Sequence, residues 1–258
     1  MLLPAVFASL LLYISGLILN DYMDRYIDAR ERPERPIPSG RVNAIHARAA
    51  SLALMVAAIL LGVLTGVASF WVTAGVLSGL ILLYNGPARR VPLAGFAVMG
   101  LCRGCNVVLG GSVVGGLASA PVLVGAGVET SYVLCVSLLA HGEVGKPPAR
   151  WQWSLPPAVI VAASPILFLC LQAIPPTAII PLIILLAWLS ATLTNSESRA
   201  GETPRRIGVL IRGLILLQIL LITFALWQNP AWFNRATVGA LILMFIAAEW
   251  TARRFHGS

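Results

Sequence analysis

Long apolar stretches separated by short polar segments dominate the chain. Each stretch approaches 20 residues, the length of helix that crosses the hydrocarbon core of a bilayer. No polar segment between the stretches is long enough to fold alone. The pattern predicts an all-α, polytopic membrane bundle, with residues 1–258 forming a single domain. About nine transmembrane helices are expected, at residues 2–20, 47–67, 69–85, 92–118, 120–141, 154–173, 176–195, 205–227 and 232–250.

Composition strengthens the membrane assignment. Of the 258 residues, 58% are hydrophobic and only 11% are charged, and the mean hydropathy is +0.86. Soluble domains carry about 25% charged residues, so an ordinary soluble protein is excluded. Gly100 and Gly104, spaced four apart in one apolar stretch, predict a close approach of two helices. Cys102 and Cys105 in the same stretch are interpreted as small packing residues rather than a redox or metal pair.

Positive charge is concentrated in alternate loops. The segment 21–48 holds six arginines, and further Lys and Arg residues lie near 89, 146, 205 and the C-terminus. The loops near 68, 119, 174 and 230 carry almost none. By the positive-inside rule, the basic loops are cytoplasmic. We expect a multi-pass integral protein of a bacterial inner membrane. No basic face with interleaved aromatic residues is present, so nucleic acid is not an expected partner.

An acidic motif follows the first apolar stretch. It reads Asn20-Asp21-Tyr-Met-Asp24-Arg-Tyr-Ile-Asp28, with carboxylates at i, i+3 and i+7. On a helix this spacing places them on one face, where they repel one another unless a cation holds them. Mg²⁺ binds carboxylate oxygens and often shares them with substrate phosphates. The alternative is a solvated acidic turn after a membrane span. The spacing favours a Mg²⁺ site.

The loop after this motif is basic and rich in proline. It reads Arg30-Glu-Arg-Pro-Glu-Arg35-Pro-Ile-Pro-Ser-Gly40-Arg41. Prolines stop a helix and stiffen the turn, so a plain rigid connector is one interpretation. The functional interpretation is that the loop holds Arg35 and Arg41 opposite the carboxylates. The planar fork of arginine suits phosphate oxygens. Together the two segments predict a diphosphate site, and the apolar bundle beneath implies a lipid tail.

These residues resemble the UbiA superfamily of membrane prenyltransferases. The resemblance rests on the acidic motif from Asn20 to Asp28 and on Arg35-Pro-Ile-Pro-Ser-Gly40, with support from Tyr84-Asn85 to Arg89-Arg90. It covers the chain from residue 1 to about 225. It implies a helical bundle around a central cavity, an isoprenyl diphosphate bound through Mg²⁺, and transfer of the prenyl group to an aromatic or other lipophilic acceptor. Members use two Asp-rich motifs.

The resemblance also suggests roles for individual residues. Asp21, Asp24 and Asp28 would hold Mg²⁺ and act as the catalytic cluster, and Asn20 would orient that cluster or the diphosphate. Arg35 would bind the diphosphate, as would Arg41 with less support from the resemblance.

The sequence departs from the family pattern in two places. Where the second Asp-rich motif is expected, the loop reads His141-Gly-Glu143-Val-Gly-Lys146, with a single carboxylate. Glu143 or Lys146 would then reach the diphosphate. The loop composition resembles the EboC-like branch of the superfamily. In addition, family members have a helix before the one that carries the acidic motif. Only 19 residues precede Asn20, which implies an absent helix or a late start.

Several arginines have two interpretations. Arg89 and Arg90 bind substrate or simply mark the cytoplasmic face. Arg103 lies within an apolar stretch, where a charge marks a cavity or a polar partner. It lines the cavity near a polar group of the acceptor, or it pairs with Glu129 or a backbone carbonyl. Arg212 is expected to extend toward the membrane interface.

A second functional hypothesis is a non-catalytic binder or transporter of a prenylated or lipophilic precursor. The degraded second motif supports it.

Overall fold

The computed structural model describes residues 2–113, 119–141, 148–171, 176–194, 202–228 and 232–255, and all regular structure in them is helical. Nine α-helices are present there, which confirms the all-α fold class. They are α1 (Leu2–Glu31), α2 (Ala44–Leu64), α3 (Ala68–Asn85), α4 (Pro92–Ser112), α5 (Ala120–His141), α6 (Leu155–Leu171), α7 (Pro176–Thr194), α8 (Glu202–Gln228) and α9 (Trp232–Phe255), with short 3-10 helices η1 (Ala88–Arg90) and η2 (Arg150–Ser154).

Within the described ranges, six helices are long and apolar enough to cross a membrane. They are α1 to α5 and α8. The apolar parts of α7 and α9 described there, Ala178–Ser190 and Ala236–Ala252, are shorter. Helix α1 has 30 residues and runs eleven residues beyond the predicted end of the span at residue 20. At 1.5 Å per residue it is about 45 Å long, more than the roughly 30 Å hydrocarbon core. Its last turns therefore extend past the apolar layer.

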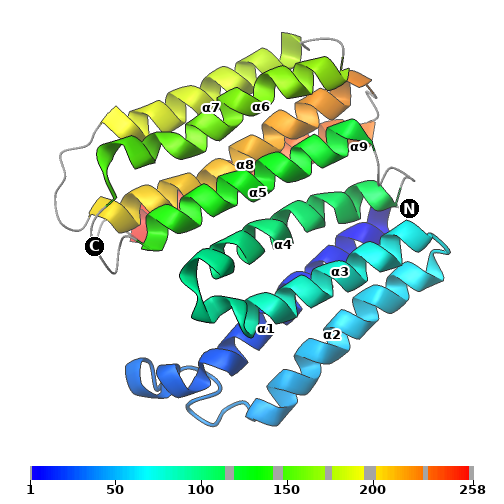
Figure 1. The fold of residues 1–258 in the computed structure, drawn as a ribbon, viewed down its shortest axis with the longest axis vertical. Helices are drawn as coiled ribbons and strands as arrows, with labels where there is room; N and C mark the ends of the chain where they lie inside the picture. Colours follow the sequence, from blue (N-terminus) through cyan, green and yellow to red (C-terminus); the bar gives the residue numbers. More distant parts are fainter. Residues whose placement is uncertain are drawn as a thin grey trace. The chain divides into compact units, whose positions relative to one another are not determined.

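The chain divides into two compact units, Met1–Leu134 and Cys135–Ser258. In unit 1, α1 packs against α2, α3 and α4, and α3 packs against both α2 and α4 (Figure 1). In unit 2, α8 packs against α7 and α9. Helix α5 belongs to unit 1 up to Leu134. That the whole chain forms a single domain stays a prediction.

Small residues bring the helices of unit 1 close together. A Cβ atom on Gly100 would lie 2.6 Å from the carbonyl oxygen of Thr130, and one on Gly104 would lie 2.7 Å from that of Ala126. Both distances are too short for a side chain, so the predicted close approach is confirmed between α4 and α5. The most deeply buried apolar residues of the unit 1 core are Ala8 and Leu12 of α1, Ala58 of α2, Phe70 and Ala74 of α3, and Leu109 of α4.

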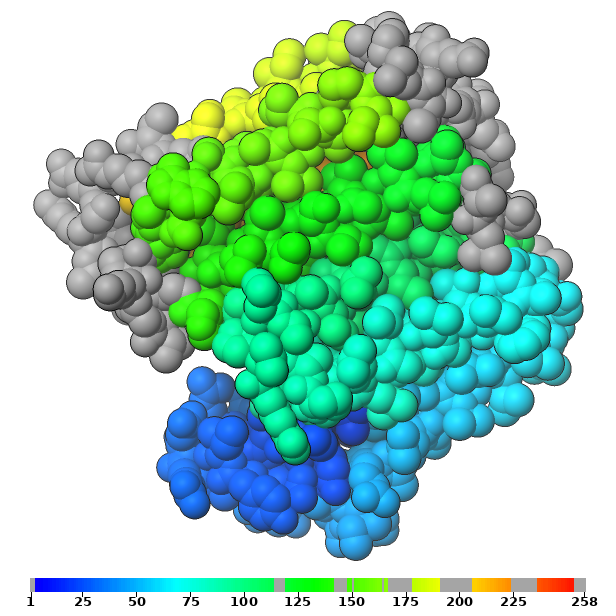
Figure 2. Space-filling model, in the orientation of Figure 1, coloured from blue at the N-terminus to red at the C-terminus, as the bar shows by residue number. Residues whose placement is uncertain are grey.

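The loop from residue 32 to 43 is a folded turn that reverses the chain. The backbone N–H of Val42 donates to the carbonyl of Pro36 at 2.9 Å, and Gly40 has a φ of +76°, which favours glycine. The Asn43 side chain then caps α2 by accepting from the N–H of Ile45 at 2.8 Å. This loop and residues 86–91 lie at the same end of unit 1 (Figure 1). In Figure 2 the last turns of α1 and the loop form a compact lobe there, in dark blue.

In unit 2, an ion pair joins α8 to α9. Arg212 Nε donates to Glu249 Oε1 at 2.6 Å, and the two side chains are 18% and 24% exposed. The structure gives Arg212 a carboxylate partner 37 residues away. Its extension toward the membrane interface stays a prediction.

Candidate functional site

The three carboxylates of the acidic motif lie on the last turns of α1, but they do not gather around one point. Asp28 is 6% exposed, whereas the side chain of Asp21 is 54% exposed. In the described part of the chain, no three Asp, Glu, His or Cys side chains are placed to hold a metal ion. Each aspartate of the motif faces an arginine instead. The motif therefore forms two ion-paired groups rather than one open cluster.

The first group is centred on Arg35. Its Nη1 donates to Asp28 Oδ2 at 2.8 Å and lies 3.6 Å from Asp21 Oδ1. The hydrogen bond from Arg35 to Asp28 raises the pKa of the guanidinium, and the charges of Asp28, Asp21 and Asp24 add to this effect, while burial opposes it. The proline-rich loop thus returns Arg35 to the face of α1 that carries the motif.

The second group joins α1 to the segment after α3. Arg89, in η1, pairs through Nη2 with Asp24 Oδ1. The other oxygen of Asp24 accepts a hydrogen bond from Asn20 Nδ2 at 3.0 Å. The side chains of Arg89 and Asp24 are 31% and 19% exposed, so this pair is more sheltered than an ordinary surface salt bridge. Both oxygens of the central aspartate are therefore engaged.

The structure does not bring every predicted site residue to the motif. Arg41 is exposed and donates to the carbonyl of Glu34 and to Ser39 Oγ, so it contacts its own loop. Arg90 is exposed, and the described residues give it no carboxylate partner. Glu143 and Lys146 lie outside the described residues.

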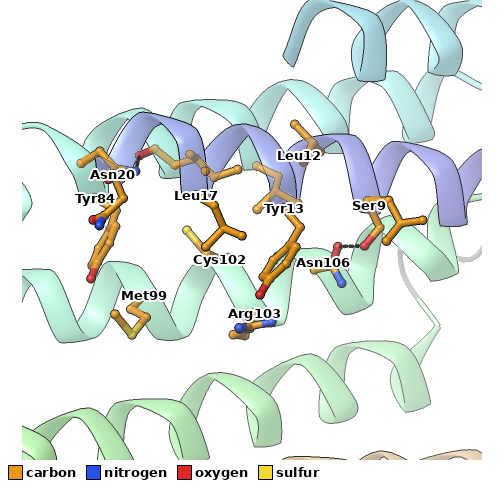
Figure 3. Close-up of a pocket in the computed structure, with 15 residues that line it drawn as sticks. Ser9, Leu12, Tyr13, Leu17, Asn20, Tyr84, Met99, Cys102, Arg103 and Asn106 are labelled. Atoms are coloured by element: carbon orange, nitrogen blue, oxygen red, sulfur yellow. Dashed lines mark hydrogen bonds between the residues drawn. The ribbon is translucent and has the colours of Figure 1, made fainter. Parts of the chain in front are cut away.

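A cavity of about 470 Å³ lies within unit 1, between α1, α3 and α4. Asn20 stands at one end, and the hydrogen bond from Ser9 Oγ to Asn106 Oδ1, 2.7 Å long, stands at the other (Figure 3). Asn20 follows Ser9 by eleven positions on α1, or about 16 Å along the helix. Most of the wall between them is apolar, and it includes Leu12, Leu17, Leu77, Ile81 and Met99.

Arg103 lines this cavity. Its guanidinium carbon lies 6.0 Å from the centre of the Tyr13 ring, and the two side chains point toward each other (Figure 3). Among the residues that the structure describes, no carboxylate lies within ion-pair distance of it. Of the two interpretations from sequence, the cavity rather than a pair with Glu129 fits this placement.

Sequence reasoning missed the polar residues deeper in the cavity, Ser9, Tyr13 and Asn106. One signal was present, because Asn106 follows Arg103 by three residues and shares its helix face within an apolar stretch. Asn85 was noted only as part of a turn, whereas the structure buries it in the cavity wall.

The family model for the UbiA prenyltransferase family matches residues 1–207, and the chain belongs to this family. The resemblance drawn from the motifs is thus confirmed. Placement in the EboC-like branch stays a prediction.

Similar curated proteins are named digeranylgeranylglyceryl phosphate synthase. The one from Methanothrix thermoacetophila is 34% identical over 136 residues, covering 52% of this chain and 47% of the relative. The one from Natronomonas pharaonis is 35% identical over 119 residues, covering 46% and 43%. The chain spans about half the length of these relatives or less. No solved structure matches it.

Proposed function

We propose that this protein is a Mg²⁺-dependent prenyltransferase that moves a prenyl group from an isoprenyl diphosphate to an aromatic or other lipophilic acceptor. One observation carries the proposal. Two arginines from separate segments, Arg35 and Arg89, pair with the aspartates of the acidic motif. The first residue of that motif, Asn20, lines the apolar cavity. A charged head and a hydrocarbon tail in one ligand match these two adjoining regions.

The arginines are suited to the diphosphate. Each presents a planar fork that recognises phosphate oxygens, and each pairs with a carboxylate in this structure. A diphosphate that arrives with a cation allows an exchange of partners. Asp21, Asp24 and Asp28 would then hold the cation, and Arg35 and Arg89 would bind the phosphate oxygens. The ion pairs therefore hold both sets of groups near the positions where they are needed.

The acidic motif fits Mg²⁺ by the chemistry of its donors. Asp21, Asp24 and Asp28 offer hard carboxylate oxygens within two turns of one helix, which is the ligand type that Mg²⁺ prefers. Bound there, the ion would neutralise the charge that builds on the departing diphosphate. Asn20 holds Asp24 in place through its amide, and this contact would orient the cluster.

The cavity supplies the remaining parts of the reaction. Tyr84 and Tyr13 line it, and aromatic faces stabilise an allylic cation formed when the bond to the diphosphate weakens. Arg103 offers a positive charge beyond them for a polar or anionic group on the acceptor. The name of the relatives describes a glyceryl phosphate with two geranylgeranyl groups, and a lipid phosphate acceptor would suit Arg103.

We place the acidic motif on the cytoplasmic side. The basic loops after α1 and α3 lie at one end of unit 1, and loops rich in arginine stay in the cytoplasm. The relatives are archaeal, so the bacterial inner membrane stays a prediction.

The test uses the purified full chain with Mg²⁺, geranylgeranyl diphosphate and a panel of aromatic and lipid acceptors. Asp24→Asn should weaken Mg²⁺-dependent binding of the diphosphate by at least about tenfold, because one charged contact is worth more than about 1.4 kcal/mol. Glu31→Gln is the control, since it removes the same charge from the exposed end of α1. Equal affinity of wild type and Asp24→Asn would exclude the motif as the metal site. Binding without product across the panel would favour the non-catalytic binder.

A further inference from the structure

Asn85, the last residue of α3, has an unsatisfied side-chain oxygen. The residue is 3% exposed and belongs to the cavity wall. Its Nδ2 donates to the carbonyl of Ile81 at 2.9 Å, while its Oδ1 has no hydrogen-bond partner in the described structure. A buried polar atom without a partner costs about 1–3 kcal/mol. Such an atom beside a cavity calls for a ligand.

The amide cannot relieve this cost by turning over. Exchanging its nitrogen and oxygen would place Oδ1 against the carbonyl of Ile81, where two acceptors repel. The bond to Ile81 therefore fixes the orientation of the amide and leaves Oδ1 as its atom without a partner. Its neighbour Tyr84 also lines the cavity, at the end marked by Asn20 (Figure 3). The free oxygen thus lies near the candidate diphosphate site.

The chemistry of the donor substrate excludes it as the missing partner. At neutral pH the oxygens of an isoprenyl diphosphate only accept hydrogen bonds, and its tail is hydrocarbon. Of the two substrates, only the second can therefore donate a hydrogen bond to Asn85 Oδ1. Arg103 already brings a positive charge to the cavity lining, which disfavours a second cation inside it. A neutral hydroxyl group satisfies the geometry and the charge.

We propose that Asn85 is a positioning residue for the prenyl acceptor, and that its Oδ1 accepts a hydrogen bond from a hydroxyl group of that acceptor. This inference rests on the proposed function and narrows its acceptor to molecules that carry an O–H group. Asn85 orients the hydroxyl oxygen at the end of the cavity next to the acidic motif. Acceptors with no hydroxyl lose this contact and leave the amide oxygen buried without a partner.

Two probes that differ only in the hydroxyl group test the proposal. They are 4-octylphenol and its methyl ether, 4-octylanisole, titrated separately into the purified full chain in detergent. The wild type should bind the phenol about five- to tenfold more tightly, the value of one net hydrogen bond. Asn85→Leu, of similar volume, should bind both probes with equal affinity. Asn85→Ala serves as a second variant if the leucine disturbs the fold, as judged by the melting temperature.

Ser78→Ala is the matched control. Ser78 lies seven residues earlier on α3, is buried, and donates its hydroxyl to the carbonyl of Ala74 at 2.8 Å. It does not line the cavity, so its variant should keep the preference for the phenol. Equal affinity of the two probes for wild type, or an unchanged preference in both Asn85 variants, would overturn the proposal and assign the oxygen to water.

The failure of this inference is distinguishable from that of the proposed function. Mg²⁺-dependent binding of geranylgeranyl diphosphate is measured on the same samples without either probe. The wild type and the Ser78→Ala control, whose changed residue does not line the cavity, should both show this binding. Normal diphosphate binding with no phenol preference removes only the role of Asn85. Absence of diphosphate binding in wild type removes the proposed function, on which the acceptor role depends.

Discussion

Replacing Arg89 by glutamine should change two affinities in opposite directions. Arg89 pairs with Asp24 in this structure. It therefore competes with a metal ion for that carboxylate, yet it serves the diphosphate once the ligand is bound. In Arg89→Gln, the affinity for Mg²⁺ alone should rise, and the Mg²⁺-dependent affinity for geranylgeranyl diphosphate should fall.

The size of the effect follows from the surroundings of the pair. A charged hydrogen bond contributes about 1.5–3 kcal/mol, and a side chain that is one-third exposed falls in the lower part of this range. About 1.5–2 kcal/mol corresponds to a loss of roughly 10–30-fold in diphosphate affinity. For Mg²⁺ alone, release of Asp24 from a partly exposed pair is worth about 0.5–1 kcal/mol, a gain of roughly two- to fivefold.

Isothermal titration of the purified chain measures both affinities. Arg90→Gln is the charge-matched comparison, because it alters the adjacent residue, which has no carboxylate partner among the described residues. Its effects should stay within about threefold, as for a surface charge. A parallel loss of both affinities in Arg89→Gln would refute the exchange of partners. Equal losses of diphosphate affinity in Arg89→Gln and Arg90→Gln would mean that Arg89 only attracts anions through its charge.

Three further predictions concern topology and packing. A single cysteine at Ser39, in a background without native cysteines, should be labelled only from the cytoplasmic side, and labelling from the opposite side alone would invert the orientation. Gly104→Ala should lower the melting temperature, because overpacking costs about 1–3 kcal/mol of stability. Gly110→Ala should not, because its added Cβ would meet no atom within 4 Å. A double-mutant cycle of Arg212→Met and Glu249→Gln, read by thermal unfolding, should give a coupling of about 1–2 kcal/mol, and additive effects would contradict the ion pair.

Much of the fold could be predicted, because lipid imposes a simple rule on the chain. Every span must be apolar along its length, and this property is legible in the sequence. The end of α1 was harder to predict. Hydropathy marks where the apolar layer stops, near residue 20, whereas the backbone hydrogen bonds of the helix continue to Glu31. The charged turns beyond that layer look like a loop to any rule based on hydrophobicity.

The candidate site was predictable only in part. Helical spacing placed Asp21, Asp24 and Asp28 on one face, and the loop composition pointed to Arg35. The partner of Asp24, however, is Arg89, which lies 65 residues further along the chain in η1. Its choice depends on how α1 and α3 are rotated against each other, which local spacing does not encode. The role of Glu143 stays a prediction.

Because α1 is one continuous helix, it fixes the distance between the two ends of the cavity. Ser9 at the far end of the cavity and Asn20 at its mouth belong to one unbroken helix, so their separation is set by residue count rather than by the adjustment of loops. Inserting one residue between them would turn the acidic motif by about 100° away from Arg89. Only insertions or deletions of three or four residues, which are close to one whole turn, would keep the acidic motif facing Arg89. Cavity depth in proteins built this way should therefore vary in steps of about 5 Å rather than continuously.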